Sequence, residues 1–252
     1  MKRYFSFFYF VFLALISLPL TCFIIRTFNL LRRRMPYFEN KPNKVATLWA
    51  RFFFAVVPGW HVTIKGRENL VPLGKTVIFV SNHQSMADVF MMFLLDRPFS
   101  FIAKESIFKM PIMGPTTAAL RNIPLRRNDP RSAQAAMEQC EILLKKGTSV
   151  FLYPEGTRSK TGELLPFKSG AFRLSKKLNI PIQPLAVIGA KDLLEKGSFI
   201  PKSFYASVTV LPLMEPLQEI STETMAKNTQ QLISQYLGGT PLADAVTNVS
   251  RA

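Results

Sequence analysis

The sequence predicts an α/β domain with a mostly parallel sheet flanked by helices, preceded by an N-terminal membrane-associated helical segment. Short apolar runs alternate with longer amphipathic ones between residues 61 and 220, which is typical of strands that alternate with helices. Polar loops follow two of these apolar runs directly, as active-site loops do in parallel sheets. We therefore divide the chain into N-terminal membrane-anchoring helices with a basic linker (1–60), an α/β domain (61–220) and a C-terminal helix with a flexible tail (221–252).

Residues 4–25 are almost wholly apolar and uncharged, long enough for the roughly 20 residues of a membrane-spanning helix. This run exceeds the roughly 7–15 residues of a signal-peptide core and has no clear small-residue cleavage site, so we expect a retained anchor. Residues 45–60, interrupted by Arg51 and closed by Pro58-Gly59, suit a helix that lies at the membrane interface or packs on the first helix. The sequence leaves open whether the pair spans the bilayer or enters one leaflet.

The chain carries 32 Lys and Arg against 16 Asp and Glu, a net charge of +16. This balance predicts an anionic partner, which could be nucleic acid, a membrane surface or a phosphorylated substrate. A basic cluster follows the first apolar segment, opposed by Glu39 alone, and comprises Arg26, Arg32, Arg33, Arg34, Lys41, Lys44 and Arg51. Its position favours the lipid bilayer over nucleic acid, and we expect membrane localisation with the rest of the chain on the cytoplasmic face.

Cysteine and histidine are scarce. The two cysteines, Cys22 and Cys140, form no Cys-x-x-Cys pair, and the chain has two histidines in all. These numbers predict neither a disulfide framework nor a metal site.

The globular part contains short strand-like runs and longer helical patterns. We expect strands at residues 61–64, 76–80, 99–103, 149–153, 184–188 and 207–211, and helices at 85–95, 115–120, 130–146, 169–178 and 222–237. The longest of these helices has Asp129 as N-cap, Pro130 at its first position and Gly147 after its last turn. The polar tail after Gly238-Gly239 is expected to be mobile.

A histidine and an aspartate follow the apolar run 76–80, in Ser81-Asn82-His83-Gln84-Ser85-Met86-Ala87-Asp88. On one regular helix His83 and Asp88 would lie about 140° apart, so they can meet only if His83 lies in the loop and Asp88 in the first turn of the next helix. Ser85 is then the expected N-cap. The carboxylate would hold one ring nitrogen while the other faces a substrate. The alternative is a loop histidine that satisfies backbone groups.

Three further stretches carry polar or rigid residues next to apolar ones. Tyr153-Pro154-Glu155-Gly156-Thr157-Arg158 combines a glycine that permits close backbone approach with an arginine suited to phosphate, although a turn with a surface salt bridge would look similar. Asn122-Ile123-Pro124-Leu125-Arg126-Arg127 ends in two arginines that could equally form a solvated basic face. Ile180-Pro181-Ile182-Gln183-Pro184 precedes a strand, which two prolines could simply stiffen.

These four blocks resemble, in order, those of the glycerolipid acyltransferases: a His-x4-Asp block, an arginine-bearing block, a Phe-Pro-Glu-Gly-Thr-Arg block and a proline-containing block. Residues 101–104 and 167–170 look similar as well. The chain departs from the family pattern at Tyr153, where phenylalanine is usual, and at Pro124, where an aromatic residue is usual. Because the arginine is doubled, either Arg126 or Arg127 could be the ligand-binding residue, and alignment favours Arg127.

The resemblance implies a transferase that moves a fatty acyl group from acyl-CoA or acyl-carrier protein to the sn-2 hydroxyl of 1-acyl-sn-glycerol-3-phosphate (lysophosphatidic acid). The product would be phosphatidic acid, in phospholipid biosynthesis, with no cofactor beyond the acyl donor. His83 would be the general base and Asp88 would fix its tautomer. The resemblance implies substrate-binding roles for Glu155, Gly156, Thr157, Arg158, Arg127, Arg126 and Lys104.

Three other functions compete with this one. The chain could acylate a different lysophospholipid, or could be a membrane-anchored protein that binds anionic lipid without catalysis. A lipid or thioester hydrolase is disfavoured because the sequence has no Gly-x-Ser-x-Gly elbow.

Overall fold

The computed structural model describes residues 2–35, 39–85, 87–159, 163–193 and 204–238. Their contacts define two compact units. The first comprises the described residues within Met1–His61, Val89–Cys140 and Asp192–Tyr205, and the second those within Val62–Asp88, Glu141–Lys191 and Ala206–Ala252.

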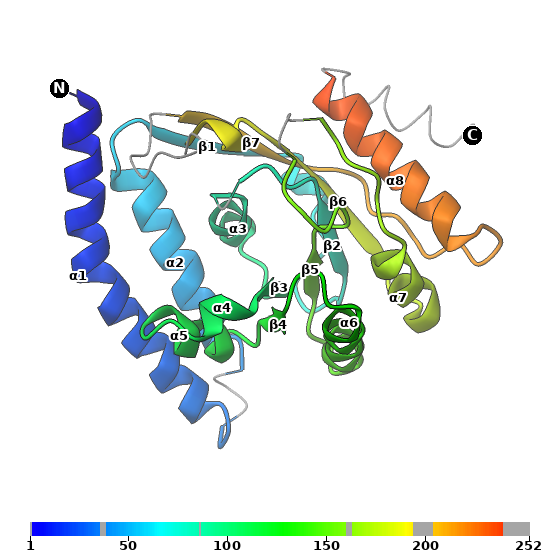
Figure 1. Ribbon diagram of the computed structural model, residues 1–252, viewed down its shortest axis with the longest axis horizontal. Coiled ribbons are helices and arrows are strands. Elements are labelled where there is room, and N and C mark those ends of the chain that lie inside the picture. The colour runs from blue at the N-terminus through cyan, green and yellow to red at the C-terminus, as the bar shows by residue number, and fades with distance from the viewer. Residues whose placement is uncertain (1, 36–38, 86, 160–162, 194–203, 239–252) are drawn as a thin grey trace. The chain divides into compact units, whose positions relative to one another are not determined.

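The first unit is mainly helical and contains a pair of short strands (Figure 1). Its elements are α1 (Lys2–Leu31), α2 (Lys41–Val56), the 3₁₀ helix η3 (Phe93–Leu95), β3 (Ser100–Lys104), α4 (Glu105–Phe108), α5 (Met113–Ala119) and β4 (Ile123–Leu125). α1 packs against α2 and α5, and the indole N–H of Trp49 on α2 donates to Ser17 Oγ on α1 at 3.1 Å. β3 and β4 are parallel, so their carboxyl ends lie at the same edge.

Helix α1 is longer than the apolar run that predicts it. It continues to Leu31 through Arg26, because an arginine ends an apolar run without disfavouring helical backbone. Within it, Val11–Leu31 has a mean hydropathy of 2.1 with 12% buried, which makes α1 long and apolar enough to cross a membrane. α2 ends before Pro58-Gly59, as the sequence predicts.

The second unit contains a five-stranded arrangement in the order β1 (Trp60–Lys65), β7 (Phe204–Val210), β6 (Ile182–Ile188), β2 (Ile78–Ser81) and β5 (Val150–Leu152). β2 runs parallel to both β5 and β6, whereas β7 is antiparallel to β6. All four residues of β2 are buried. The predicted interior strand and the mostly parallel sheet are confirmed.

Two helices of the second unit, α7 (Gly170–Leu178) and α8 (Thr222–Leu237), pack against each other, α7 also on β2 and α8 also on β6. A core cluster comprises Ala186, Leu211, Leu232 and Ile233. Ser221 caps α8 by accepting the Thr224 N–H at 3.0 Å. The remaining elements are η2 (Arg67–Asn69), η4 (Ala190–Leu193), and two helices that run from one unit into the other, α3 (Ala87–Met92) and α6 (Pro130–Lys145).

Four short elements, α4, β4 and the 3₁₀ helices η2 and η4, are absent from the sequence prediction, and β6 begins two residues earlier than predicted. Pro124 lies in the middle of β4. Because proline has no N–H to donate, a short run that contains it is predicted as a loop and not as a strand. β6 includes Pro184 because Ile182 exchanges two backbone hydrogen bonds with Met214, each 2.8 Å long, before the proline is reached. The predicted mobile tail, 239–252, lies outside the described residues.

Candidate active site

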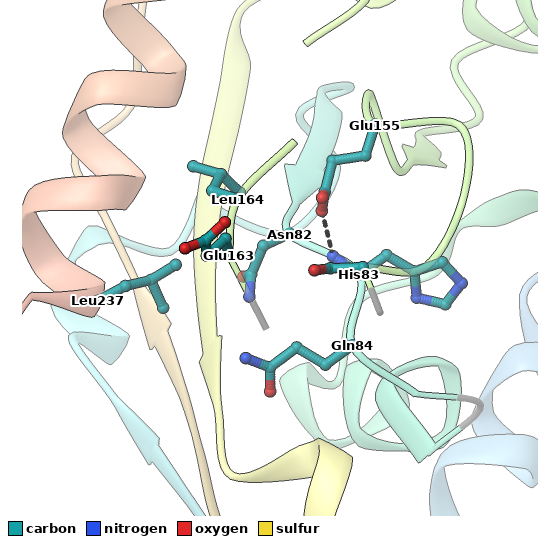
Figure 2. A pocket seen from close by; sticks show the side chains of 8 residues that line it. Asn82, His83, Gln84, Glu155, Glu163, Leu164 and Leu237 are labelled. Atoms are coloured by element: carbon teal, nitrogen blue, oxygen red, sulfur yellow. Dashed lines mark hydrogen bonds between the residues drawn. The ribbon is translucent and has the colours of Figure 1, made fainter. Parts of the chain in front are cut away.

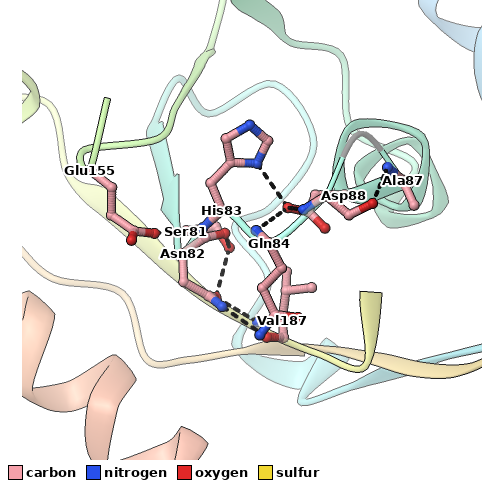
Figure 3. Close-up of polar contacts among 9 residues, drawn as sticks. Ser81, Asn82, His83, Gln84, Ala87, Asp88, Glu155 and Val187 are labelled. Atoms are coloured by element: carbon pink, nitrogen blue, oxygen red, sulfur yellow. Dashed lines mark hydrogen bonds and ion pairs between the residues drawn. The ribbon is translucent and has the colours of Figure 1, made fainter. Parts of the chain in front are cut away.

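His83 and Asp88 meet as the sequence predicts. His83 lies in the loop after β2, and Asp88 lies in the first turn of α3, where Ser85 Oγ accepts the Ala87 N–H at 3.2 Å. His83 Nδ1 is 2.8 Å from Asp88 Oδ2, and a dashed line marks this contact in Figure 3. Asp88 is fully buried and His83 is 9% exposed, so the pair is shielded from water.

The hydrogen bonds around Asp88 define the imidazole tautomer. Its Oδ2 also accepts the backbone N–H groups of Gln84 at 2.7 Å and Ser85 at 2.9 Å. Oδ2 therefore acts as an acceptor, and Nδ1 is the ring nitrogen that carries a hydrogen toward it. Nε2 is then left to accept a proton.

Asn82 fixes the start of the same loop. Its side chain forms two hydrogen bonds with the backbone of Val187 on β6: Oδ1 accepts the Val187 N–H at 2.8 Å and Nδ2 donates to the Val187 carbonyl at 2.9 Å (Figure 3). The side-chain amide of Asn82 thus bonds to the backbone of β6 directly after the backbone pairing of β2 with β6 ends at Ser81. Both polar atoms of this buried side chain are satisfied, so these bonds stabilise the start of the loop that carries His83.

Glu155, in the turn after β5, connects two backbone segments. Its Oε1 accepts the His83 N–H at 2.6 Å and its Oε2 accepts the Leu165 N–H at 3.0 Å. Burial raises the pKa of the Glu155 carboxyl above its usual value, against the opposing effect of these two hydrogen bonds. The predicted substrate-binding role of Glu155 stays a prediction, and both of its oxygens already accept backbone N–H groups.

Tyr153 lies flat against the imidazole. The centroids of the Tyr153 and His83 rings are 3.9 Å apart with an interplanar angle of 19°. The ring of Tyr153 also packs on Phe151, at 5.0 Å. Its hydroxyl is buried and has no hydrogen-bond partner among the described residues, and burial, followed by the charge of Asp88, raises its pKa well above the usual value. Sequence reasoning marked Tyr153 only as a departure from a motif.

The rest of this turn is open to solvent. Gly156, Thr157 and Arg158 are exposed, and Gly156 has a φ of 70°. A Cβ added to Gly156 would lie 2.8 Å from Lys168 Nζ, so a side chain there would displace this lysine. The Ser159 N–H donates to the His83 carbonyl at 3.1 Å, which joins the end of the turn to the histidine loop.

A small pocket lies behind the loop that carries His83. It has a volume of about 160 Å³, part of it open to solvent, and is lined by Asn82, His83, Gln84, Glu155, Ser159, Glu163, Leu164 and Leu237. The imidazole points away from Leu164 and Leu237, so His83 contributes its backbone side to the lining (Figure 2). Its enclosed space is too small even for a water molecule, whereas ligand pockets usually measure about 300–1,000 Å³. We therefore do not take this pocket as the place where Nε2 meets a substrate.

The other basic residues predicted to bind the substrate lie in the first unit. Lys104 ends β3, and Arg126 and Arg127 directly follow β4, whose Leu125 pairs with Lys104. Arg126 forms ion pairs with Glu105 at 3.3 Å and with Asp129 at 3.5 Å. In the part of the chain that the structure describes, Arg127 is exposed and has no such partner.

The described residues show neither a metal-ligand cluster nor a reactive thiol at Cys140. No cluster of three or more His, Cys, Asp or Glu side chains that could hold a metal occurs within the described ranges. Burial raises the pKa of the Cys140 thiol to about 12, which keeps it protonated and unreactive.

The chain is similar to known proteins over the residues that carry this site. A sequence model of the family described as Acyltransferase matches residues 61–188. The chain is 38% identical over 171 residues to "1-acyl-sn-glycerol-3-phosphate acyltransferase BAT2, chloroplastic" of Brassica napus, covering 68% of this chain and 47% of that protein. It is 33% identical over 196 residues to the yeast (Saccharomyces cerevisiae) 1-acyl-sn-glycerol-3-phosphate acyltransferase, covering 75% and 62%. The chain thus spans about half the length of the plant relative.

The crystal structure of the 1-acyl-sn-glycerophosphate acyltransferase PlsC from Thermotoga maritima has the same fold. The TM-score is 0.78, with 95% of this chain and 97% of that chain covered, at 23% sequence identity. The matched residues 61–188 contain both the His83–Asp88 pair and the Glu155 turn. With the family match extending over half of its length, the chain belongs to the Acyltransferase family.

Proposed function

We propose that this protein transfers a fatty acyl group from acyl-CoA or acyl-carrier protein to the sn-2 hydroxyl of 1-acyl-sn-glycerol-3-phosphate, giving phosphatidic acid for phospholipid biosynthesis. The observation that carries the proposal is the 2.8 Å contact between His83 Nδ1 and Asp88 Oδ2. Because Nδ1 is bound to Asp88, Nε2 is the ring nitrogen that can accept the proton of an alcohol. The names of the matched relatives support this choice of acceptor.

In the proposed reaction, Nε2 of His83 accepts the proton of the sn-2 hydroxyl as its oxygen attacks the thioester carbonyl carbon. The tetrahedral intermediate then collapses, the carbon–sulfur bond breaks, and the leaving thiolate takes the proton back from the imidazolium. Asp88 stabilises the imidazolium and holds its orientation throughout. No acyl-enzyme is needed, because the lipid hydroxyl is itself the nucleophile.

The serines beside His83 do not favour a hydrolase with a serine nucleophile. Ser81 Oγ is buried and donates to the Asn82 carbonyl at 3.1 Å, and Ser85 Oγ is engaged with the start of α3. Neither hydroxyl is hydrogen-bonded to the imidazole in the described part of the chain, whereas a nucleophile and its base lie within hydrogen-bond reach. A lipid hydroxyl therefore suits this histidine better.

We assign binding of the substrate phosphate to Arg127 and Arg158, both exposed, with Arg126 and Lys104 as weaker candidates. Gly156 and Thr157 are assigned to the glycerol moiety. We further propose that α1 holds the protein at a membrane, with the α/β part on the cytoplasmic face, because the acceptor is a lipid. The apolar surface of α1 supports this: Leu15 is 71% and Phe23 67% exposed.

The activity is tested by release of free thiol from the acyl donor by detergent-purified protein. We expect release only when lysophosphatidic acid is present, with phosphatidic acid as the product in mass spectra. His83→Ala should lower the rate by about 10²- to 10⁴-fold, whereas the matched variant His61→Gln should keep it. Crossing acyl-CoA and acyl-carrier protein with several lysolipids identifies donor and acceptor.

The other functions give different results in the same assay. Thiol release without any lysolipid would indicate a hydrolase. Lipid binding with no thiol release from any donor would indicate a binding protein, and full activity of His83→Ala would remove the histidine from the mechanism.

A further inference from the structure

Tyr153 makes the closest ring contact with His83. Its ring centroid is 3.9 Å from that of the imidazole, and the two planes are 19° from parallel. The acyltransfer proposed above assigns a proton transfer to His83 and none to Tyr153. The contact therefore calls for its own explanation.

The segment that starts at Tyr153 contacts His83 at both of its backbone polar groups and at one face of its ring. Glu155 Oε1 accepts the His83 N–H at 2.6 Å, and the Ser159 N–H donates to the His83 carbonyl at 3.1 Å. With both backbone groups paired, the imidazole can still rotate about its side-chain torsions. The hydrogen bond to Asp88 restrains one ring atom, and a flat contact restrains the plane of the ring.

The polar end of Tyr153 makes no comparable contact. Its hydroxyl is buried, has no hydrogen-bond partner among the described residues, and stays protonated because its pKa is raised by burial. An unpartnered buried hydroxyl contributes nothing to orientation and is a net cost to stability. Whatever Tyr153 does for His83 must therefore come from its ring.

We propose that Tyr153 is a positioning residue, whose ring holds the His83 imidazole in the plane in which Nδ1 meets Asp88 and Nε2 faces the acceptor hydroxyl. This inference rests on the proposed function, because it takes the orientation of Nε2 to matter for the rate. Phenylalanine should perform the same task, since the ring alone is used.

Two substitutions separate the ring from the hydroxyl. Tyr153→Phe should keep kcat within about twofold. Tyr153→Leu should lower kcat by about 2- to 12-fold, the range that one aromatic pair contributes, with little change in KM for lysophosphatidic acid. Phe172→Leu on α7, at a fully buried aromatic residue that does not stack on His83, is the control for general loss of packing. If Tyr153→Leu does not fold, Tyr153→Met provides the same comparison.

A spectroscopic measurement tests the orientation without substrate. The chain has two histidines, so in a His61→Gln background every histidine nitrogen signal belongs to His83. In ¹⁵N-histidine-labelled protein we expect the Nδ1–H tautomer in wild type and in Tyr153→Phe, and a mixture of tautomers in Tyr153→Leu. Failure of the wild type to acylate lysophosphatidic acid would contradict the proposed function, while this spectrum would still decide whether the ring contact orients His83.

Two results would overturn the proposal. One is a Tyr153→Leu protein with wild-type kcat and the wild-type tautomer. The other is a Tyr153→Phe protein that loses as much activity as Tyr153→Leu, because the hydroxyl and not the ring would then be responsible.

Discussion

At the scale of single residues, the site is organised by carboxylates that accept backbone N–H groups. Asp88 accepts two such groups besides the imidazole, and Glu155 accepts one from His83 and one from Leu165. A buried carboxylate without such donors would be costly. The two acidic side chains thus stabilise the loops around His83 as well as setting its chemistry.

Glu155 should make stability depend on pH. Because its pKa is raised in the folded protein, folding binds a proton between the unfolded pKa, near 4.5, and the higher folded value. The stability from this group is fully present below pH 4.5 and is lost as the pH rises through the folded pKa. Glu155→Gln removes that contribution, so the difference in unfolding free energy between wild type and variant should be larger at pH 4 than at pH 7.

Denaturant unfolding at both pH values measures this difference. Glu138→Gln is the matched control, since Glu138 is an exposed residue on α6 whose loss should shift stability little at either pH. A larger difference at pH 7 than at pH 4 would mean that the two backbone donors outweigh burial and lower the pKa of Glu155.

Sequence reasoning reached part of the site and missed the rest for a physical reason. The His83–Asp88 pair could be predicted because the two residues are five positions apart, within the reach of loop and helix geometry. The bonds from Asn82 to Val187 and the stacking of Tyr153 on His83 join residues 105 and 70 positions apart. Such contacts depend on the order of strands in the sheet, which no local pattern reports.

At the scale of elements, the long periodic helices were predicted well, whereas one short strand, β4, was not predicted. α6 begins at Pro130 as expected, with Asp129 Oδ1 accepting the N–H groups of Arg131 at 3.0 Å and Ser132 at 3.2 Å. α8 has its predicted bounds, 222–237. β4 has three residues and one of them is proline, so its register with β3 is set by tertiary pairing and not by propensity.

The two adjacent arginines that follow β4 differ in their carboxylate partners. Arg126 already has two carboxylate partners, Glu105 and Asp129, and Arg127 has none in the described chain. We therefore expect Arg127→Ala to raise KM for lysophosphatidic acid with little change in kcat. Arg126→Ala should leave KM close to that of wild type. Initial rates over a range of lysolipid concentrations measure both, and a larger effect of Arg126→Ala on KM would reverse the assignment.

At the scale of the whole molecule, the first helix and the charge of the chain give two ways to bind a membrane. The net charge of +16 would attract anionic headgroups, an effect that salt screens. The apolar surface of α1 would insert into the hydrocarbon region, which salt does not weaken. The two contributions can therefore be separated by ionic strength.

We expect α1 to dominate, so the protein should stay with phosphatidylcholine vesicles, which have no net charge, in about 1 M NaCl, where the Debye length is about 3 Å. Leu15→Asp should weaken this association, because an aspartate inside the bilayer costs about 2.5–3.5 kcal/mol. Leu73→Asp is the matched control: Leu73 is 71% exposed, like Leu15, but lies outside α1. Co-flotation with the vesicles measures both variants. Release of the wild type by salt, or equal weakening by the two substitutions, would show that charge holds the protein at the membrane and that α1 does not insert.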